Sequence, residues 1–62
     1  MPYVNVRTAG TITYEQKEQI AEEISETLER VLNKPRSATY ITFDEIPREN
    51  WAVGGNLLGK KD

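Results

Sequence analysis

The sequence predicts an α+β fold, in which a β-α-β unit is followed by a short β-hairpin. An alternating stretch at 3–8 and a stretch rich in β-branched and aromatic residues at 38–46 flank a long amphipathic segment at 14–32. Near the carboxyl end, Gly54–Asn56 separates two short apolar pieces and is typical of a tight hairpin turn. No repeat or linker divides the 62 residues, so we expect a single domain over 1–62.

The first strand is predicted at Tyr3–Thr8 from the two-residue period of its apolar positions. Val4 and Val6 fall on one face, and the opposite face carries Tyr3, Asn5 and Arg7. The stretch "AGTIT" that follows contains a glycine and is expected to form a loop that leads into the helix.

The helix is predicted to run from about Tyr14 to Leu32. Thr13 and Gln16 match a capping box, in which each side chain bonds the other residue's backbone amide. Asn33 suits a left-handed C-cap, and Pro35 prevents the helix from continuing. One apolar stripe follows the helical period and consists of Ile20, Ala21, Ile24, Leu28, Val31 and Leu32.

The second strand is predicted at Ala38–Ile46 from its β-branched and aromatic content. Two strands joined by a long helix form a βαβ unit, so they should be parallel with a right-handed crossover. Trp51–Val53 and Leu57–Leu58 are the expected arms of the hairpin. One helix leaves a sheet face and two edges open, and so short a chain buries little core, so we expect a neighbouring chain to cover them.

The composition excludes several classes of site. The chain has no cysteine and no histidine, which removes disulfides, the usual nucleophile–base pairs and the thiolate and imidazole metal ligands, so we expect no metal and no cofactor. Eight scattered Lys and Arg and a net charge of −2 argue against nucleic acid, and the single helix argues against a ribbon-helix-helix DNA binder. No apolar run approaches the roughly 20 residues of a membrane span. Without a signal-peptide core, the expected location is cytoplasmic.

Pro2 is the candidate general base. A proline is tolerated at the first residue of an edge strand, which is a purely structural interpretation. If Met1 is removed, however, Pro2 carries a free amine, and an α-amino group has a pKa of about 7.7–8. Partial burial among Tyr3, Trp51 and Val53 would lower that pKa, because burial disfavours the ammonium form. A base whose pKa lies near neutral pH is suited to abstracting a proton beside a carbonyl.

Four stretches of the chain form a recognisable set. They are "MPYVNV" with its proline after the initiator, the helix "EQKEQIAEEISETLERVL", the strand "ATYITFDEI" and the hairpin "NWAVGGNLL". Over essentially its whole length, the chain resembles the 4-oxalocrotonate tautomerase family. The resemblance implies a β-α-β protomer that forms dimers, usually three dimers in a hexamer.

The resemblance also implies an isomerase. Members lose the initiator methionine and use the terminal proline, here Pro2, as general base in keto-enol tautomerisation by a 1,3- or 1,5-proton shift. The implied substrate is a small carbonyl or enol acid, either a 2-hydroxy-dienoate or an enolpyruvate-type acid. The aromatic residue that makes the family's site apolar corresponds to Trp51. The expected substrate-binding residues are Trp51, Tyr40, Arg7, Tyr3 and Val53.

Two positions depart from the family pattern. Members that act on dicarboxylated dienols carry an arginine in the loop after the first strand and another in the second strand, where this chain has Ile12 and Tyr40. Tyr40 can donate one hydrogen bond to a carbonyl or enolate oxygen, whereas arginine donates two. The candidates for a replacement cation are, in order, Arg7, Arg48 and Arg36. The alternatives are a weakly active or non-catalytic oligomeric homologue, and a related dehalogenase or decarboxylase.

Overall fold

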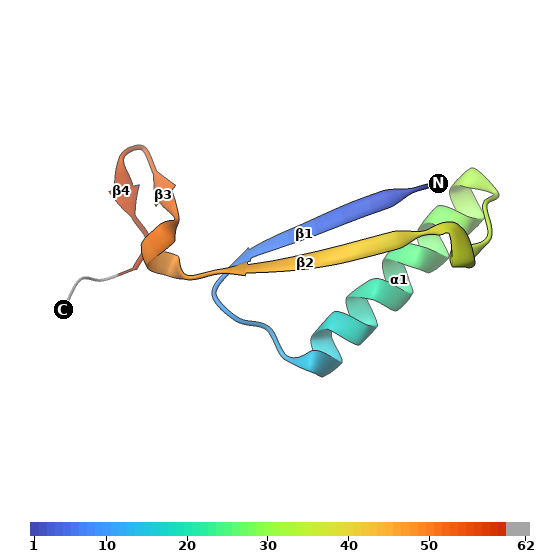
Figure 1. The fold of residues 1–62 in the computed structure, drawn as a ribbon, viewed down its shortest axis with the longest axis horizontal. Coiled ribbons are helices and arrows are strands. Elements are labelled where there is room, and N and C mark those ends of the chain that lie inside the picture. Colours follow the sequence, from blue (N-terminus) through green and yellow to red (C-terminus); the bar gives the residue numbers. More distant parts are fainter. Residues whose placement is uncertain (60–62) are drawn as a thin grey trace.

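The computed structural model describes residues 1–59, and its elements follow the predicted β-α-β order (Figure 1). A parallel strand pair and one helix form the main unit, and two 3-10 turns and a short hairpin complete the chain. The bounds are β1 Tyr3–Ala9, α1 Tyr14–Leu32, η1 Arg36–Ala38, β2 Tyr40–Ile46, η2 Arg48–Asn50, β3 Ala52–Val53 and β4 Asn56–Leu57.

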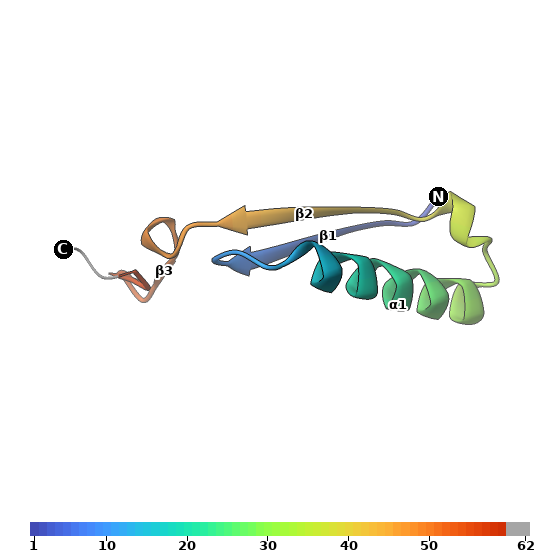
Figure 2. The ribbon, with the colours of Figure 1, turned by 90° about the horizontal axis from the view of Figure 1, so that it is seen from below.

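β1 and β2 pair in parallel, with Tyr3 opposite Tyr40 at one end and Ala9 opposite Ile46 at the other. Helix α1 lies along one face of this sheet, and no element of residues 1–59 covers the other face (Figure 2). Half-buried and exposed side chains alternate along both strands, as the two-residue period predicts. The predicted α+β class, the parallel pairing and the single long helix are confirmed.

Two boundaries of the β1–β2 sheet differ from the prediction. β1 continues one residue further, to Ala9. β2 begins at Tyr40 rather than at Ala38, because residues 36–38 form the 3-10 turn η1. The Ala38 amide donates to the Pro35 carbonyl oxygen at 2.9 Å, and this turn carries the chain from the helix layer to the sheet layer.

Both ends of α1 form as predicted. The Gln16 amide donates to Thr13 Oγ1 at 3.1 Å, and the Thr13 amide donates to Gln16 Oε1 at 2.9 Å, which completes the capping box. Asn33 ends the helix in the left-handed region, with φ 57°. Neither α1 nor another helix within residues 1–59 is long and apolar enough to cross a membrane.

Ion pairs join α1 to two other elements, β2 and η1. Lys17 Nζ lies 2.6 Å from Glu45 Oε1 on β2, and both side chains are half-buried. The hydrogen bond from Lys17 holds the pKa of Glu45 below its ordinary value. Towards the other end, Arg36 Nη1 lies 2.8 Å from Glu22 Oε1, and Arg36 Nε lies 3.7 Å from Glu29 Oε1. These contacts fix η1 against the helix.

The β3–β4 hairpin projects beyond the carboxyl end of the sheet (Figure 1). Val53 pairs with Asn56, and Gly54 and Gly55 between them have φ values of 58° and 87°, as a type I′ turn requires. The predicted hairpin is therefore confirmed, but its arms differ: Asn56 belongs to β4 rather than to the turn, and Trp51 and Leu58 lie outside both strands. Because the hairpin extends outwards, the chain measures 48 × 25 × 13 Å and its radius of gyration is 15.0 Å. A compact chain of this length would have a radius of about 10.6 Å.

The isolated protomer has no closed core. No side chain among residues 1–59 is fully buried, and several large apolar side chains are mostly exposed, including Val31, Val53 and Leu57. Exposed apolar area of this extent is typical of a surface that another chain covers. The architecture is consistent with the expectation of an oligomer.

Candidate active site

Pro2 lies at the amino end of β1 and is half-buried. Its carbonyl oxygen accepts a hydrogen bond from the Tyr40 amide at 3.0 Å, which extends the parallel ladder by one step. Figure 1 shows the amino terminus beside the carboxyl end of α1. The proline therefore has a fixed backbone and lies at one end of the sheet.

Tyr3 and Tyr40 lie side by side on the open face of the sheet at the same end. Their side chains are 62% and 56% exposed. The Tyr3 hydroxyl shares a 2.7 Å hydrogen bond with Thr42 Oγ1, whereas the Tyr40 hydroxyl bonds no other group in the described part of the chain. Of the two phenols near Pro2, only that of Tyr40 has no hydrogen-bond partner in residues 1–59.

Arg7 is not close to Pro2 within one protomer. It lies five residues along β1, which is about 17 Å in an extended strand. Its Nε donates to Asn5 Oδ1 at 3.0 Å and lies 3.4 Å from Asp44 Oδ2. Asn5 Nδ2 also donates to Asp44 Oδ2 at 3.0 Å. Arg7 therefore belongs to a polar network with Asn5 and Asp44 on the open face of the sheet.

Trp51 and Val53 lie at the opposite end of the molecule from Pro2 (Figure 1). The length of β2, about 20 Å, separates them from the proline. Burial of Pro2 among Tyr3, Trp51 and Val53 is therefore wrong for a single chain. The physical reason is that the segment after β2 continues outwards through η2 instead of folding back along the sheet.

The other replacement cations also lie in defined contacts. Arg36 is held by two carboxylates of α1. Arg48, in η2, lies beside the loop after β1, because a Cβ placed on Gly10 would meet Arg48 Nε at 3.7 Å. Ile12, which stands where the family resemblance expects an arginine, belongs to the same loop. The Arg48 side chain thus lies beside that loop.

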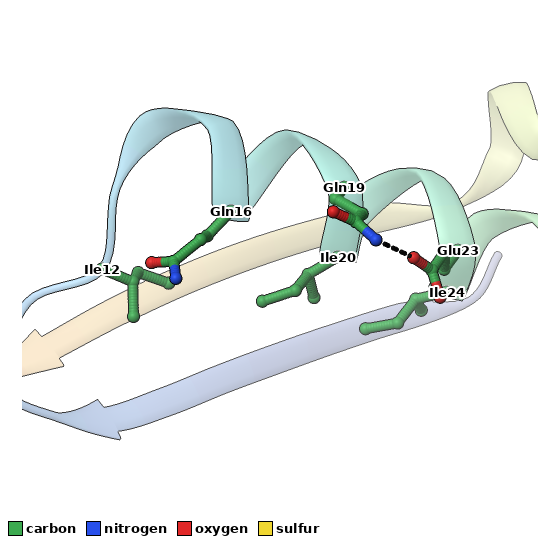
Figure 3. A pocket seen from close by; sticks show the side chains of 6 residues that line it. All are labelled: Ile12, Gln16, Gln19, Ile20, Glu23 and Ile24. Atoms are coloured by element: carbon green, nitrogen blue, oxygen red, sulfur yellow. Dashed lines mark hydrogen bonds between the residues drawn. The ribbon is translucent and has the colours of Figure 1, made fainter.

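A groove of about 390 Å³ runs along α1 (Figure 3). Three isoleucines form its apolar surface, and Gln19 donates to Glu23 at 2.8 Å on its polar side. Its lining residues are Ile12, Gln16, Gln19, Ile20, Glu23 and Ile24. The groove lies away from Pro2 along the sheet. Nowhere in residues 1–59 do three potential metal-ligating side chains cluster.

Sequence reasoning missed Thr39. This residue precedes β2, and its hydroxyl oxygen is buried without a hydrogen-bond partner in the described residues. The alternation of β2 could have indicated it, because Thr39 lies two residues before the inward-facing Ile41.

Comparison with known proteins decides the family. The family model described as "Tautomerase enzyme" matches residues 2–61. The chain belongs to the tautomerase family. It is 38% identical to "Probable tautomerase K2" of Dickeya dadantii, with 98% of this chain and 92% of the relative covered. It is 27% identical to a 2-hydroxymuconate tautomerase of Pseudomonas putida, with 89% and 87% covered.

A solved relative shows the same architecture. The crystal structure of DmpI from Helicobacter pylori matches with a TM-score of 0.83 at 30% identity, covering 92% of this chain and 90% of that one. The tautomerase described here is accordingly an isomerase, and its β-α-β unit and hairpin are those of the family.

Proposed function

We propose that this tautomerase interconverts the enol and keto forms of a small carboxylic acid, with the amine of Pro2 as general base after Met1 has been removed. The substrate is a 2-hydroxy-dienoate or an enolpyruvate-type acid. The observation that carries the proposal is the position of Pro2, which is half-buried and fixed by the Tyr40 amide at the end of β1.

The chemistry is a balanced proton transfer. The neutral amine of Pro2 takes the proton of the enol hydroxyl, and the electrons of that O–H bond become the carbonyl π bond. The carbon–carbon double bond then takes the proton back from the prolinium, at the third carbon for a 1,3-shift or at the fifth for a 1,5-shift. An amine whose pKa lies near neutral pH can both accept and return the proton.

Tyr40 is the proposed donor to the substrate oxygen. Its hydroxyl is free in the described structure and belongs to the residue whose amide binds Pro2. A hydrogen bond to the carbonyl or enolate oxygen stabilises the negative charge that develops there. One phenol holds a carboxylate less firmly than an arginine, so we expect a substrate with a single carboxylate and an apolar remainder.

We further propose that the site is completed by neighbouring protomers, within dimers that assemble into a hexamer. The separation of Trp51 and Val53 from Pro2 in one chain supports this, as do the open strand edges and the absence of a fully buried side chain in residues 1–59. A two-fold pairing would place the hairpin end of one chain at the proline end of another.

The test compares wild type with Pro2→Ala on 2-hydroxymuconate and on phenylenolpyruvate. We expect kcat/KM to fall by about 100-fold or more on the preferred substrate, because positioned general bases contribute roughly 10²–10⁴ to rates. The replacement retains a terminal amine but loses the ring that fixes it. Equal rates for the two proteins on both substrates would overturn the proposal.

A second candidate is a weakly active oligomeric homologue. Ile12 and Tyr40 at the positions of the family's arginines favour it, because Ile12 offers no hydrogen-bond donor. The same assay separates the two, since this homologue would assemble normally yet show turnover near the uncatalysed rate on both acids, with and without Pro2.

A further inference from the structure

Thr39 Oγ1 is buried without a hydrogen-bond partner in residues 1–59. Glu45 Oε1 is buried as well, but it lies 2.6 Å from Lys17 Nζ, which hydrogen-bonds to it. Thr39 Oγ1 has no such partner. Buried hydroxyls nearly always bond to something, so an unpartnered one calls for an explanation.

Thr39 is the cross-strand neighbour of Pro2. Tyr3 lies opposite Tyr40, so one step earlier in the parallel register sets Pro2 opposite Thr39, about 4.8 Å away across the ladder. The Tyr40 amide bonds the Pro2 carbonyl, and the Thr39 amide bonds the Arg36 carbonyl at 3.1 Å, so both backbones are fixed.

Pro2 and Thr39 also share a face of the sheet. Both are half-buried, as are Val4 and Ile41 two residues further along each strand, whereas Tyr3 and Tyr40 between them are exposed. In a parallel pair, opposite residues project to the same side. The hydroxyl of Thr39 therefore lies on the side of the sheet to which the Pro2 ring projects.

We infer that Thr39 is a positioning residue whose hydroxyl hydrogen-bonds the terminal amine of Pro2. The inference rests on the proposed function and adds a residue to it. While Met1 is attached, the Pro2 nitrogen is a tertiary amide with no proton to donate, which explains why Thr39 lacks a partner in this chain. Removal of Met1 gives the nitrogen one proton when neutral and two when protonated.

This contact would orient the base. When the neutral amine donates its one N–H to Thr39 Oγ1, its lone pair is left for the enol proton. When the prolinium has formed, one N–H stays on Thr39 and the other points to the substrate carbon that receives it. Since hydrogen bonds to charged groups are stronger than those to neutral ones, Thr39 favours the protonated form.

Other groups that could influence this amine lie on the neighbouring elements, and the variants below leave all of them unchanged. They are Tyr3, Tyr40 and Arg36, with Glu26, Glu29 and Arg30 in the last two turns of α1 and Lys34 after it. A difference in the pH profile between wild type and a Thr39 variant therefore reports on the hydroxyl itself.

The test uses Thr39→Val, which replaces the hydroxyl by a methyl of similar size, and Thr39→Ser, which keeps the hydroxyl. For Thr39→Val we expect kcat to fall about 10-fold and the acid limb of the kcat/KM profile to move down by about 0.5–1 pH unit, because the protonated base has lost an acceptor. Thr39→Ser should restore both values. The urea midpoint of Thr39→Val should equal or exceed that of wild type.

Two results would overturn the inference. One is a Thr39→Val enzyme with the wild-type pH profile and kcat while Pro2→Ala is strongly impaired, which leaves the proposed function intact. The other is a Thr39→Ser enzyme as impaired as Thr39→Val, which would show that the methyl group matters and the hydroxyl does not. An unimpaired Pro2→Ala enzyme would instead reject the proposed function itself.

Discussion

Pro2, Tyr40 and Thr39 lie at one end of the sheet, with Pro2 and Thr39 on the helix side and the Tyr40 ring on the open face. The parallel register brings them to the same end, since the amino ends of β1 and β2 lie side by side. Pro2 supplies the proposed base, Tyr40 the donor to substrate oxygen and Thr39 the acceptor for the amine. At the residue scale, the proposed chemistry depends on these three groups.

Tyr40→Phe removes the free phenol and keeps the ring. We expect kcat/KM to fall about 10-fold, which is the size of one hydrogen bond to a developing negative charge. Tyr3→Phe is the matched control, because its hydroxyl already bonds Thr42 on the open face. Steady-state kinetics measures kcat/KM for both variants. A larger loss of kcat/KM for Tyr3→Phe than for Tyr40→Phe would contradict the assignment.

The sequence predicts some of these residues and not others. Pro2 could be selected because a proline after the initiator methionine can carry a free amine, and Tyr40 because it stands where the family resemblance expects an arginine. Thr39 was missed although strand alternation extends to it, because a threonine beside a strand attracts no attention until its hydroxyl is found buried without a partner. Arg7 was a reasonable candidate by strand face, but its guanidinium pairs with Asp44, a contact that depends on strand register.

At the scale of elements, the ion pair between Lys17 and Glu45 joins the first turn of α1 to β2. A lysine near a helix amino terminus is disfavoured by the helix dipole, and the carboxylate of Glu45 offsets that charge. The hydrogen bond from Lys17 lowers the pKa of Glu45 in the folded chain.

The pH dependence of stability follows from that shift. Because the folded pKa of Glu45 lies below the unfolded value of about 4.3, its stabilisation is present above pH 4.3 and is lost as the pH falls through the folded pKa. Glu45→Gln should lower the urea midpoint at pH 7, and its difference from wild type should shrink as the pH falls below about 4.3. Unfolding at one fixed protein concentration measures this, with Glu18→Gln as the exposed control. A difference that does not shrink as the pH falls would contradict the assignment.

Element boundaries were predictable where local chemistry determines them. The capping box at Thr13 and the left-handed Asn33 define α1 to the residue, and paired glycines define the hairpin turn. The start of β2 was not predictable, because the turn at 36–38 depends on the distance from the helix layer to the sheet layer. The residues of the turn alone do not determine the distance between the two layers.

At the scale of the whole molecule, the protomer is elongated, so the two groups of residues expected in one site lie far apart within a single chain. The hairpin with Trp51 lies at one end and Pro2 at the other, so a complete site requires a second chain in the arrangement we propose. Neither strand pattern nor composition shows where a projecting hairpin will dock, because that contact is made in the assembly.

Mixing two impaired variants tests a shared site. Pro2→Ala and Trp51→Ala should each be weakly active alone. Unfolded together and refolded at equal amounts, they should regain about a quarter of the wild-type rate, since each site draws its Pro2 and its Trp51 from different chains at even odds. No gain over the separate variants, in mixtures whose co-assembly is established by native mass spectrometry, would indicate a site built within one chain.

The central claim is that the free amine of Pro2 is the base, and the most direct measurement relates activity to the loss of Met1. Intact mass gives the fraction of chains without Met1 before and during treatment with a methionine aminopeptidase, and kcat is measured on the same samples. We predict that kcat rises in proportion to the fraction of chains that begin at Pro2, because an acylated proline nitrogen has no basic lone pair. Full activity with Met1 retained on every chain would contradict the account.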